Sequence, residues 1–277
     1  MRNIFKLISI NIVTLNLLFS VNNNIAFAEM AGLDVFLESS AASENGFPSS
    51  EALGISNDGS IVVGFSTSSE GSIAFKYNSP NTVTSLGTLS GGSSSAAYGV
   101  SGDNLTIVGY SGSSDGTQAF KYTGSTMAGL GDLSGGLFAS VAYDASSDGS
   151  VIVGYGNSTE GNEAFKYEGS TMTGLGDLPG GNFLSTAYAV SDDGSVIVGY
   201  SNSTTGNEAF KYEGSTMTGL GNLSGGSYAS AAYDISGDGS VIVGYSGTSD
   251  GNRAFKYTGS TMTSLGTLGG SISVARA

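Results

Sequence analysis

The feature that most constrains this chain is a repeat with a period of 45 residues. Five copies run from about Ala52 to Gly270, and residues 271–277 open a sixth. A unit of this size cannot bury its apolar face alone, so repeats of this kind stack on their neighbours and form one continuous core. The period is clearest in one phenylalanine and one glycine per copy: Phe75, Phe120, Phe165, Phe210, Phe255 and Gly64, Gly109, Gly154, Gly199, Gly244.

Each copy divides into four runs typical of short strands, separated by turn residues. In the fourth copy the runs are Ala187–Ser191, 195–200, Ala209–Tyr212 and Met217–Leu223. Four strands of about five residues in a period of 40–45 are typical of one β-propeller blade. We therefore predict an all-β propeller of about five four-stranded blades, either a closed ring or an incomplete one; a two-coil β-solenoid is the alternative.

The second and third runs carry the predicted core. Val196, Ile197 and Val198 are apolar at successive positions, which indicates a strand buried on both faces. Phe210 and Tyr212 share one face of the third run and are predicted to fill the space between blades. Gly199 and its equivalents are predicted to allow close backbone approach where the blades converge.

An Asp-Gly pair precedes the second run in four copies, and Asp103-Asn104 replaces it in another. Asp, Asn and Gly tolerate positive φ, so the pair predicts a two-residue type I′ hairpin. Calcium binding by these aspartates is the less favoured alternative, because one hairpin Asp does not offer six converging oxygens. Each copy also has one lysine, which we expect at a solvated strand edge; an ion pair with the hairpin Asp, such as Lys211 with Asp193, is a sharper hypothesis.

The chain start is typical of a secretory signal peptide. Arg2 and Lys6 precede an apolar stretch, and Ala26-Phe27-Ala28 forms a cleavage site, so residues 1–28 are predicted to be removed near Ala28. Asparagines interrupt the apolar stretch, which is also short for a membrane span. Residues 29–51 are a lead-in with a possible strand at Leu33–Leu37, and residues 52–277 are the repeats.

Composition excludes several classes of site and partner. The net charge is −14, and the sequence has no Cys or His. Thiolate and imidazole metal sites and disulfides are thus excluded, and neither metal nor cofactor is predicted. An acidic surface repels phosphate, so we expect no nucleic-acid partner. We also expect no membrane insertion once the signal peptide has been cleaved.

The ordered motifs A-x-x-[VI]-S-x-D-G-S-x-I-V-G-Y, x-A-F-x-Y and M-x-x-L-G-x-L-x-G-G resemble the extracellular HAF repeat family. The resemblance covers residues 52–277, and Leu265–Gly270 matches the typical L-G-T-L-G-G ending. It implies an exported bacterial surface protein, in some members an autotransporter passenger, with no common catalytic activity. The position of the family's histidine holds other residues here, so no role of that histidine carries over: Ile73, Gln118, Glu163, Glu208, Arg253.

We predict a secreted or cell-surface, non-enzymatic and monomeric scaffold for binding, adhesion or display, whose partner is an extracellular protein or glycan. Binding by such scaffolds sits in the loops that vary between copies. Leu137-Phe138 and Phe183-Leu184 are candidate contact residues, with packing between blades as the favoured alternative. The variable loops join the second and third runs: Thr67–Ser72, Gly112–Thr117, Asn157–Asn162, Asn202–Asn207, Gly247–Asn252.

Two other functions remain open. The stop within a sixth copy suggests a truncated autotransporter passenger with little function of its own. A polysaccharide-acting propeller enzyme is the less favoured alternative, since its candidate carboxylates recur as near-copies and no histidine is available as a base: Glu163, Glu168, Glu208, Glu213. No catalytic, metal, cofactor or ligand-binding residue can be assigned from the sequence.

Overall fold

A computed structural model describes residues 49–68, 71–78, 80, 82–225 and 229–276. The predicted signal peptide and the possible strand at Leu33–Leu37 lie outside the described residues.

The described chain forms five antiparallel sheets of four strands, one per repeat, in which consecutive strands are hydrogen-bonded neighbours. Blade 1 contains β1 (Ser50–Ile55), β2 (Ile61–Ser68), β3 (Gly71–Asn78) and β4 (Thr82–Gly87); blade 2 contains β5 (Ser95–Val100), β6 (Thr106–Ser113), β7 (Gly116–Thr123) and β8 (Thr126–Gly131). Blade 3 contains β9 (Val141–Ala145), β10 (Val151–Asn157), β11 (Asn162–Glu168) and β12 (Thr171–Gly174). Blade 4 contains β13 (Ser185–Val190), β14 (Val196–Ser203), β15 (Gly206–Glu213) and β16 (Thr216–Gly219); blade 5 contains β17 (Ser230–Ile235), β18 (Ile242–Thr248), β19 (Gly251–Thr258) and β20 (Thr261–Gly266).

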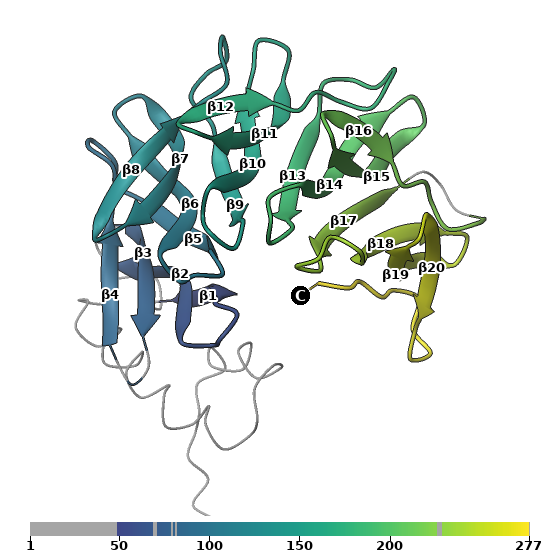
Figure 1. Ribbon diagram of the computed structural model, residues 1–277, viewed down its shortest axis with the longest axis horizontal. Coiled ribbons are helices and arrows are strands. Elements are labelled where there is room, and N and C mark those ends of the chain that lie inside the picture. Colours follow the sequence, from purple (N-terminus) through teal and green to yellow (C-terminus); the bar gives the residue numbers. More distant parts are fainter. Residues whose placement is uncertain (1–48, 69–70, 79, 81, 226–228, 277) are drawn as a thin grey trace, which may run out of the picture.

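The blades follow one another round an arc, as in a β-propeller (Figure 1). The first strand of each blade is innermost, because it contacts the first strand of the next blade, while the fourth strand lies at the outer rim. The arc is open between blade 1 and blade 5, and the C-terminus lies on the side of this opening. The predicted all-β propeller is confirmed.

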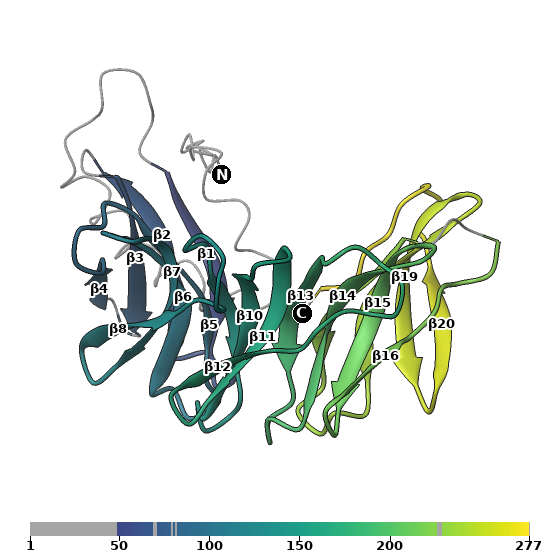
Figure 2. The same ribbon diagram turned by 90° about the horizontal axis from the view of Figure 1, so that it is seen from above.

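Antiparallel pairing places the connections on two opposite faces, and hairpins lie at both edges of the arc (Figure 2). The turns between strands one and two and between strands three and four share what we call the hairpin face. The turns between strands two and three, and the loops that cross to the next blade, share what we call the crossover face. The loops that vary between repeats therefore all lie on the crossover face.

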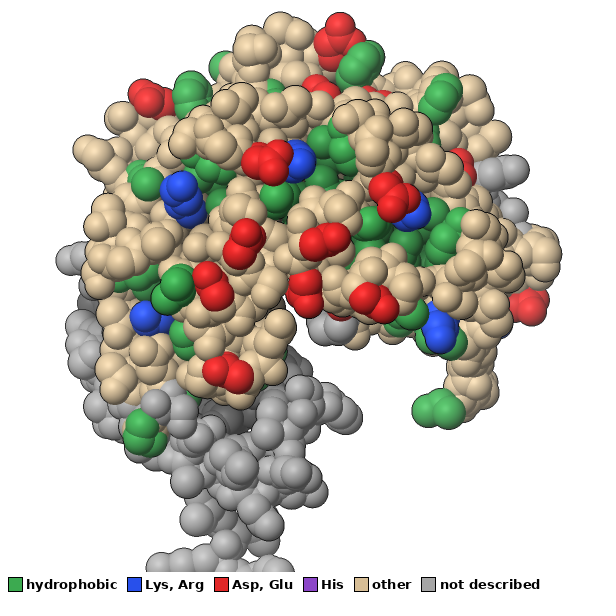
Figure 3. All heavy atoms as spheres, in the orientation of Figure 1, with side chains coloured by type: hydrophobic (Ala, Val, Ile, Leu, Met, Phe, Trp, Pro, Cys, Tyr) green, Lys and Arg blue, Asp and Glu red, His purple; other side chains and the backbone are tan. Residues whose placement is uncertain are grey.

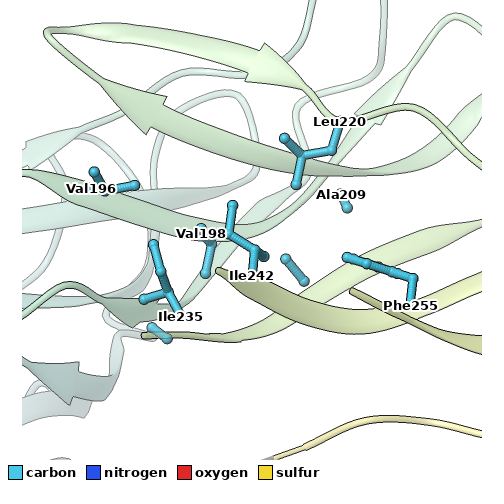
Figure 4. Close-up of a cluster of buried hydrophobic side chains, with 9 residues drawn as sticks. Val196, Val198, Ala209, Leu220, Ile235, Ile242 and Phe255 are labelled. Atoms are coloured by element: carbon cyan, nitrogen blue, oxygen red, sulfur yellow. The ribbon is translucent and has the colours of Figure 1, made fainter. Parts of the chain in front are cut away.

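The core lies between blades rather than within any one of them. Between blades 4 and 5, Phe255 and Ile242 of blade 5 pack against Val198, Ala209 and Leu220 of blade 4 (Figure 4). All five repeat phenylalanines are 0% exposed. Phe120, Phe165, Phe210 and Phe255 each pack against residues of the preceding blade, which confirms the prediction that the phenylalanines fill inter-blade space. Each of these four rings stabilises two repeats at once.

In blades 2 to 5, a serine at the start of the inner strand joins it to the preceding blade. In blade 4 the Oγ of Ser185 accepts a hydrogen bond from the backbone N–H of Ala164 at 2.9 Å and donates to the carbonyl of Gly176 at 2.8 Å. Ser185 is 0% exposed, so water cannot replace these bonds. The same pair of bonds recurs in the other repeats at Ser95, Ser140 and Ser230.

The prediction for the glycine of the second run needs correction. A Cβ on Gly199 would lie 1.9 Å from the carbonyl oxygen of Thr186, which belongs to the same blade. The cause is a β-bulge, since Ala187 pairs with Gly199 and Ala189 with Val198, leaving Tyr188 as the extra residue. These glycines therefore accommodate the bulge and not the approach of the next blade.

The Asp-Gly turn also differs from its prediction. Positive φ occurs at Gly194 (72°), while Asp193 is absent from the residues with positive φ, so this is not a type I′ turn. Two successive positive φ values, 56° and 65°, occur instead at Gly214 and Ser215, between β15 and β16. The primed two-residue turn thus joins strands three and four.

The hairpin aspartates bind the serines beside them. Asp193 Oδ1 accepts hydrogen bonds from the hydroxyls of Ser191 and Ser195, both at 2.7 Å, and from the Ser195 N–H at 2.9 Å. These bonds from Ser195 and Ser191 lower the pKa of Asp193 to about 2. Lys211 pairs with Glu213 on its own strand at 2.6 Å, so the hypothesis of a Lys211–Asp193 ion pair is wrong.

We expect the inter-blade phenylalanines to dominate stability. Phe165→Ala should lower the free energy of unfolding by about 3–5 kcal/mol, because the buried ring leaves a cavity between blades 2 and 3. Urea unfolding followed by tyrosine fluorescence measures this loss. Phe183→Ala is the matched control, since Phe183 is 45% exposed and its truncation should cost under about 1 kcal/mol. Equal losses in the two variants would contradict the inter-blade core.

Candidate functional site

In blades 2 to 5, the β-bulge of the innermost strand holds a tyrosine. The bulged residue is Tyr98 in blade 2, Tyr143 in blade 3, Tyr188 in blade 4 and Tyr233 in blade 5. A bulge frees its extra residue from the alternation of the strand and re-aims its side chain. In blade 1 the position holds Leu53, so the tyrosines begin at blade 2.

These four rings contact one another from blade to blade. The ring centroids of Tyr98 and Tyr143 are 5.2 Å apart, and the next two steps, to Tyr188 and to Tyr233, are 5.3 Å each. Each ring also contacts the tyrosine of the V-G-Y run in its own blade at 5.7–6.1 Å. We call the eight residues the tyrosine arc: Tyr98, Tyr110, Tyr143, Tyr155, Tyr188, Tyr200, Tyr233, Tyr245.

All eight tyrosines are partly exposed, in contrast to the buried phenylalanines. Aromatic rings with one covered and one open side can stack against sugar rings, aromatic groups or planar cations. The tyrosine arc is therefore a continuous row of partly exposed rings that spans four of the five blades.

One planar cation already lies at the end of the row. The guanidinium of Arg276 lies over the Tyr233 ring, with its carbon 4.8 Å from the ring centroid. Arg276 lies three residues after Ser273, as Tyr98 lies three residues after Ser95, and the two serines make the same pair of bonds to the preceding blade. Arg276 therefore stands where a sixth copy would carry its tyrosine. This contact is of the cation–π type and shows that the geometry of the arc accepts a guanidinium group.

The surroundings of the tyrosine arc are acidic. Acidic side chains gather over the inner ends of the blades in Figure 3, while lysines lie farther out. Asp144 and Asp234 directly follow the bulged tyrosines of blades 3 and 5. Glu51 and Asp132 act electrostatically on Tyr98 and Tyr155 respectively. A cation near the arc therefore meets negative charge as well as π-electron density.

Asp144 joins two blades through its carboxylate. Its Oδ2 accepts a hydrogen bond from the N–H of Val190 in blade 4 at 2.9 Å, and its Oδ1 accepts one from the N–H of Ala145 at 2.8 Å. Burial raises the pKa of Asp144 to about 7; the two N–H bonds oppose this rise, while the charges of Asp234 and Asp192 add to it.

The candidate apolar contact residues lie on the crossover face. Leu137 is 84% exposed, Phe138 40% and Phe183 45%, whereas Leu184 is partly buried. Packing between blades, the alternative favoured from the sequence, is thus wrong for the three exposed side chains. They belong to two separate crossover loops, so they form a less continuous surface than the tyrosine arc.

The candidate carboxylates of an enzyme each have a partner within their own blade. Glu163 and Glu208, at the position of the family's histidine, accept hydrogen bonds from the N–H groups of Gly176 and Gly221 at 2.8 and 2.9 Å. Glu168 and Glu213 form ion pairs with Lys166 and Lys211. Equivalent glutamates make the same hydrogen bonds and ion pairs in blades 3 and 4, which indicates a structural contact that is repeated from blade to blade.

Sequence reasoning missed the tyrosine arc, although its signal was present. The tyrosines of the first run recur every 45 residues, but they lie in an ordinary apolar strand pattern. The pattern reveals neither the bulge that holds these tyrosines nor their contacts from blade to blade.

Within the described residues, no group of three or more Asp or Glu side chains is arranged to hold a metal ion. The same part of the chain has no helix that is long and apolar enough to cross a membrane.

Comparisons with known proteins support the fold. No protein-family model and no curated protein matches the sequence. The structure is similar to TolB from Acinetobacter baumannii (TM-score 0.54, 12% identity, 76% of this chain and 52% of that one). It is also similar to a putative TolB from Agrobacterium tumefaciens (TM-score 0.55, 14% identity, 79% and 81%). A third similar structure is prolyl oligopeptidase B from Galerina marginata (TM-score 0.51, 9% identity, 78% and 35%). The chain thus spans about half of the first of these proteins, and at such identities the likeness shows the propeller fold alone.

We expect stability to depend on the charge of Asp144. Its pKa is higher in the folded chain than the ordinary 3.8, so folding favours the protonated form. The contribution is fully present below about pH 4 and is lost as the pH rises through about 7. The uncharged variant Asp144→Asn should therefore flatten the fall in melting temperature between pH 4 and pH 8. Asp250→Asn, in an exposed turn, should leave that fall unchanged; identical pH profiles for all three chains would contradict the assignment.

Proposed function

We propose that this chain is an exported, non-enzymatic binding scaffold related to the HAF repeat proteins, and that the tyrosine arc is its binding site. The observation that carries the proposal is the unbroken row of partly exposed rings on the inner side of four blades. Export rests on the signal-peptide pattern of residues 1–28.

A basic peptide segment is the ligand that best matches the site. The contact of Arg276 with Tyr233 provides the template, and arginine groups placed along a ligand could occupy the exposed sides of Tyr188, Tyr143 and Tyr98 in the same way. The neighbouring carboxylates and the net charge of −14 favour the approach of a cation. The sequence predicts an extracellular protein or glycan as partner, and this proposal narrows that prediction to a protein that presents arginines.

Export has a direct check. When the full-length chain is produced in a bacterium, we expect the protein outside the cytoplasm to begin at Glu29, as shown by its intact mass. Retention of residues 1–28 in the exported protein would contradict cleavage near Ala28.

Binding can be tested with short peptides by isothermal titration calorimetry. An arginine–glycine peptide should bind more tightly than a lysine–glycine peptide of equal length and charge, because guanidinium groups stack on rings as well as attracting carboxylates. Tyr143→Ala and Tyr188→Ala should each weaken binding about 2–30-fold, corresponding to about 0.5–2 kcal/mol for one cation–π contact.

The controls separate stacking from charge and from misfolding. Tyr212→Ala removes a tyrosine of the third strand outside the arc and should leave the affinity unchanged. Tyr143→Phe keeps the ring and should retain most of the affinity. Equal binding of the arginine and lysine peptides would indicate charge alone, and tighter binding of a neutral oligosaccharide would replace the peptide proposal with a glycan-binding one.

A further inference from the structure

The face of blade 5 that points away from blade 4 is uncovered, unlike the same face of every other blade. Leu265 is 56% exposed, while its equivalents in blades 1 to 4 are 6–9% exposed under the next blade: Leu86, Leu130, Leu175, Leu220. Leu268 is fully exposed, whereas Leu133 and Leu178 are 9% and 6% exposed. In four places the fold covers this face with another repeat.

Residues 271–276 occupy the place of the first strand of a sixth blade. Ser273 Oγ accepts a hydrogen bond from the N–H of Ala254 at 2.9 Å and donates to the carbonyl of Gly266 at 2.7 Å. These are the two bonds that each inner-strand serine makes to the preceding blade. Ile272 and Val274 beside it are 67% and 42% exposed, so they extend the uncovered apolar surface.

The start of the chain carries the sequence of a fourth strand. Met30-Ala31-Gly32-Leu33 repeats Met127-Ala128-Gly129-Leu130, which forms β8 at the outer rim of blade 2. In blade 2, Met127 packs against the buried cluster that contains Leu86 of blade 1. Met172, Met217 and Met262 pack in the same way against the clusters that contain Leu130, Leu175 and Leu220. Met30 therefore has the chemistry that covers a leucine at the position of Leu265.

The connection to blade 1 is longer than the equivalent connection within the arc. In the arc, 10 residues separate Leu130 from Ser140, the serine that begins the next inner strand, and 17 separate Leu33 from its equivalent Ser50. An extended chain spans about 3.3–3.6 Å per residue, so the additional length helps the segment to cross the opening between blades 1 and 5.

We propose that residues 30–37 dock on the uncovered face of blade 5, with Met30 over Leu265 and Leu33–Leu37 along Leu268 and residues 271–276. The segment stands in for the outer strand of a sixth blade, and residues 271–276 are its inner strand. Docking joins the two ends of the arc and removes the exposed apolar edge that would otherwise invite association. The proposal is independent of ligand binding at the tyrosine arc.

The absence of native cysteine makes a cross-linking test direct. Met30→Cys combined with Leu265→Cys in the full-length chain should give an intramolecular cross-link with a short bismaleimide, read as a shifted band on a denaturing gel and located by peptide mass. Met30→Cys combined with Leu137→Cys is the control, because Leu137 is more accessible than Leu265 (84% against 56% exposed) but lies in the crossover loop after blade 2. We expect the first pair to cross-link at least fivefold more than the control.

Three outcomes would overturn the proposal: equal yields for the two pairs, no cross-link, or cross-linked dimers alone, which would indicate that a second copy covers the face. Native circular dichroism of the cysteine variants establishes that they are folded. As a second measurement, Leu33→Asp should increase amide hydrogen exchange at residues 271–276 while leaving β9 and β13 unchanged. Unchanged exchange at residues 271–276 would also contradict docking.

Discussion

The structure depends on the packing of one repeat against the next. No single sheet of four short strands has a second layer of its own, so its apolar side chains are buried only when another blade covers them. The repeat phenylalanine and the valines of the second strand meet this requirement at each of the four interfaces. The inner-strand serines fix the spacing of the blades by hydrogen-bonding strands three and four of the preceding repeat.

This division between buried and exposed aromatics also defines the proposed site. Phenylalanines, which have no polar atom, lie between blades, whereas the tyrosines of the first and second strands lie on the inner side with their rings partly open. The bulge opposite the V-G-Y glycine links the two features. It requires a glycine within the blade, and it releases the tyrosine that contacts the next one.

The ends of the arc are where a repeat protein has the most difficulty, because each terminal unit lacks one neighbour. In blade 5, Leu265 is exposed, although its four equivalents are buried under the next blade. The tail at residues 271–276 satisfies part of the edge with the serine bonds used elsewhere, and its Arg276 extends the row of tyrosines. The tail therefore belongs both to the edge of blade 5 and to the row of tyrosines.

The sequence by itself determined the blade: its period, its four strands, the buried second strand and the inter-blade phenylalanine all follow from local patterns of apolar and turn residues. Tertiary structure decided what those patterns leave open. It placed the primed turn at Gly214-Ser215 instead of Asp193-Gly194, paired Lys211 with Glu213, and placed Tyr188 in a bulge where its ring meets the tyrosines of both neighbouring blades. The reason is physical: alternation and spacing fix which residues are apolar neighbours along a strand, but strand register and the position of the next blade fix where a side chain points and what it meets.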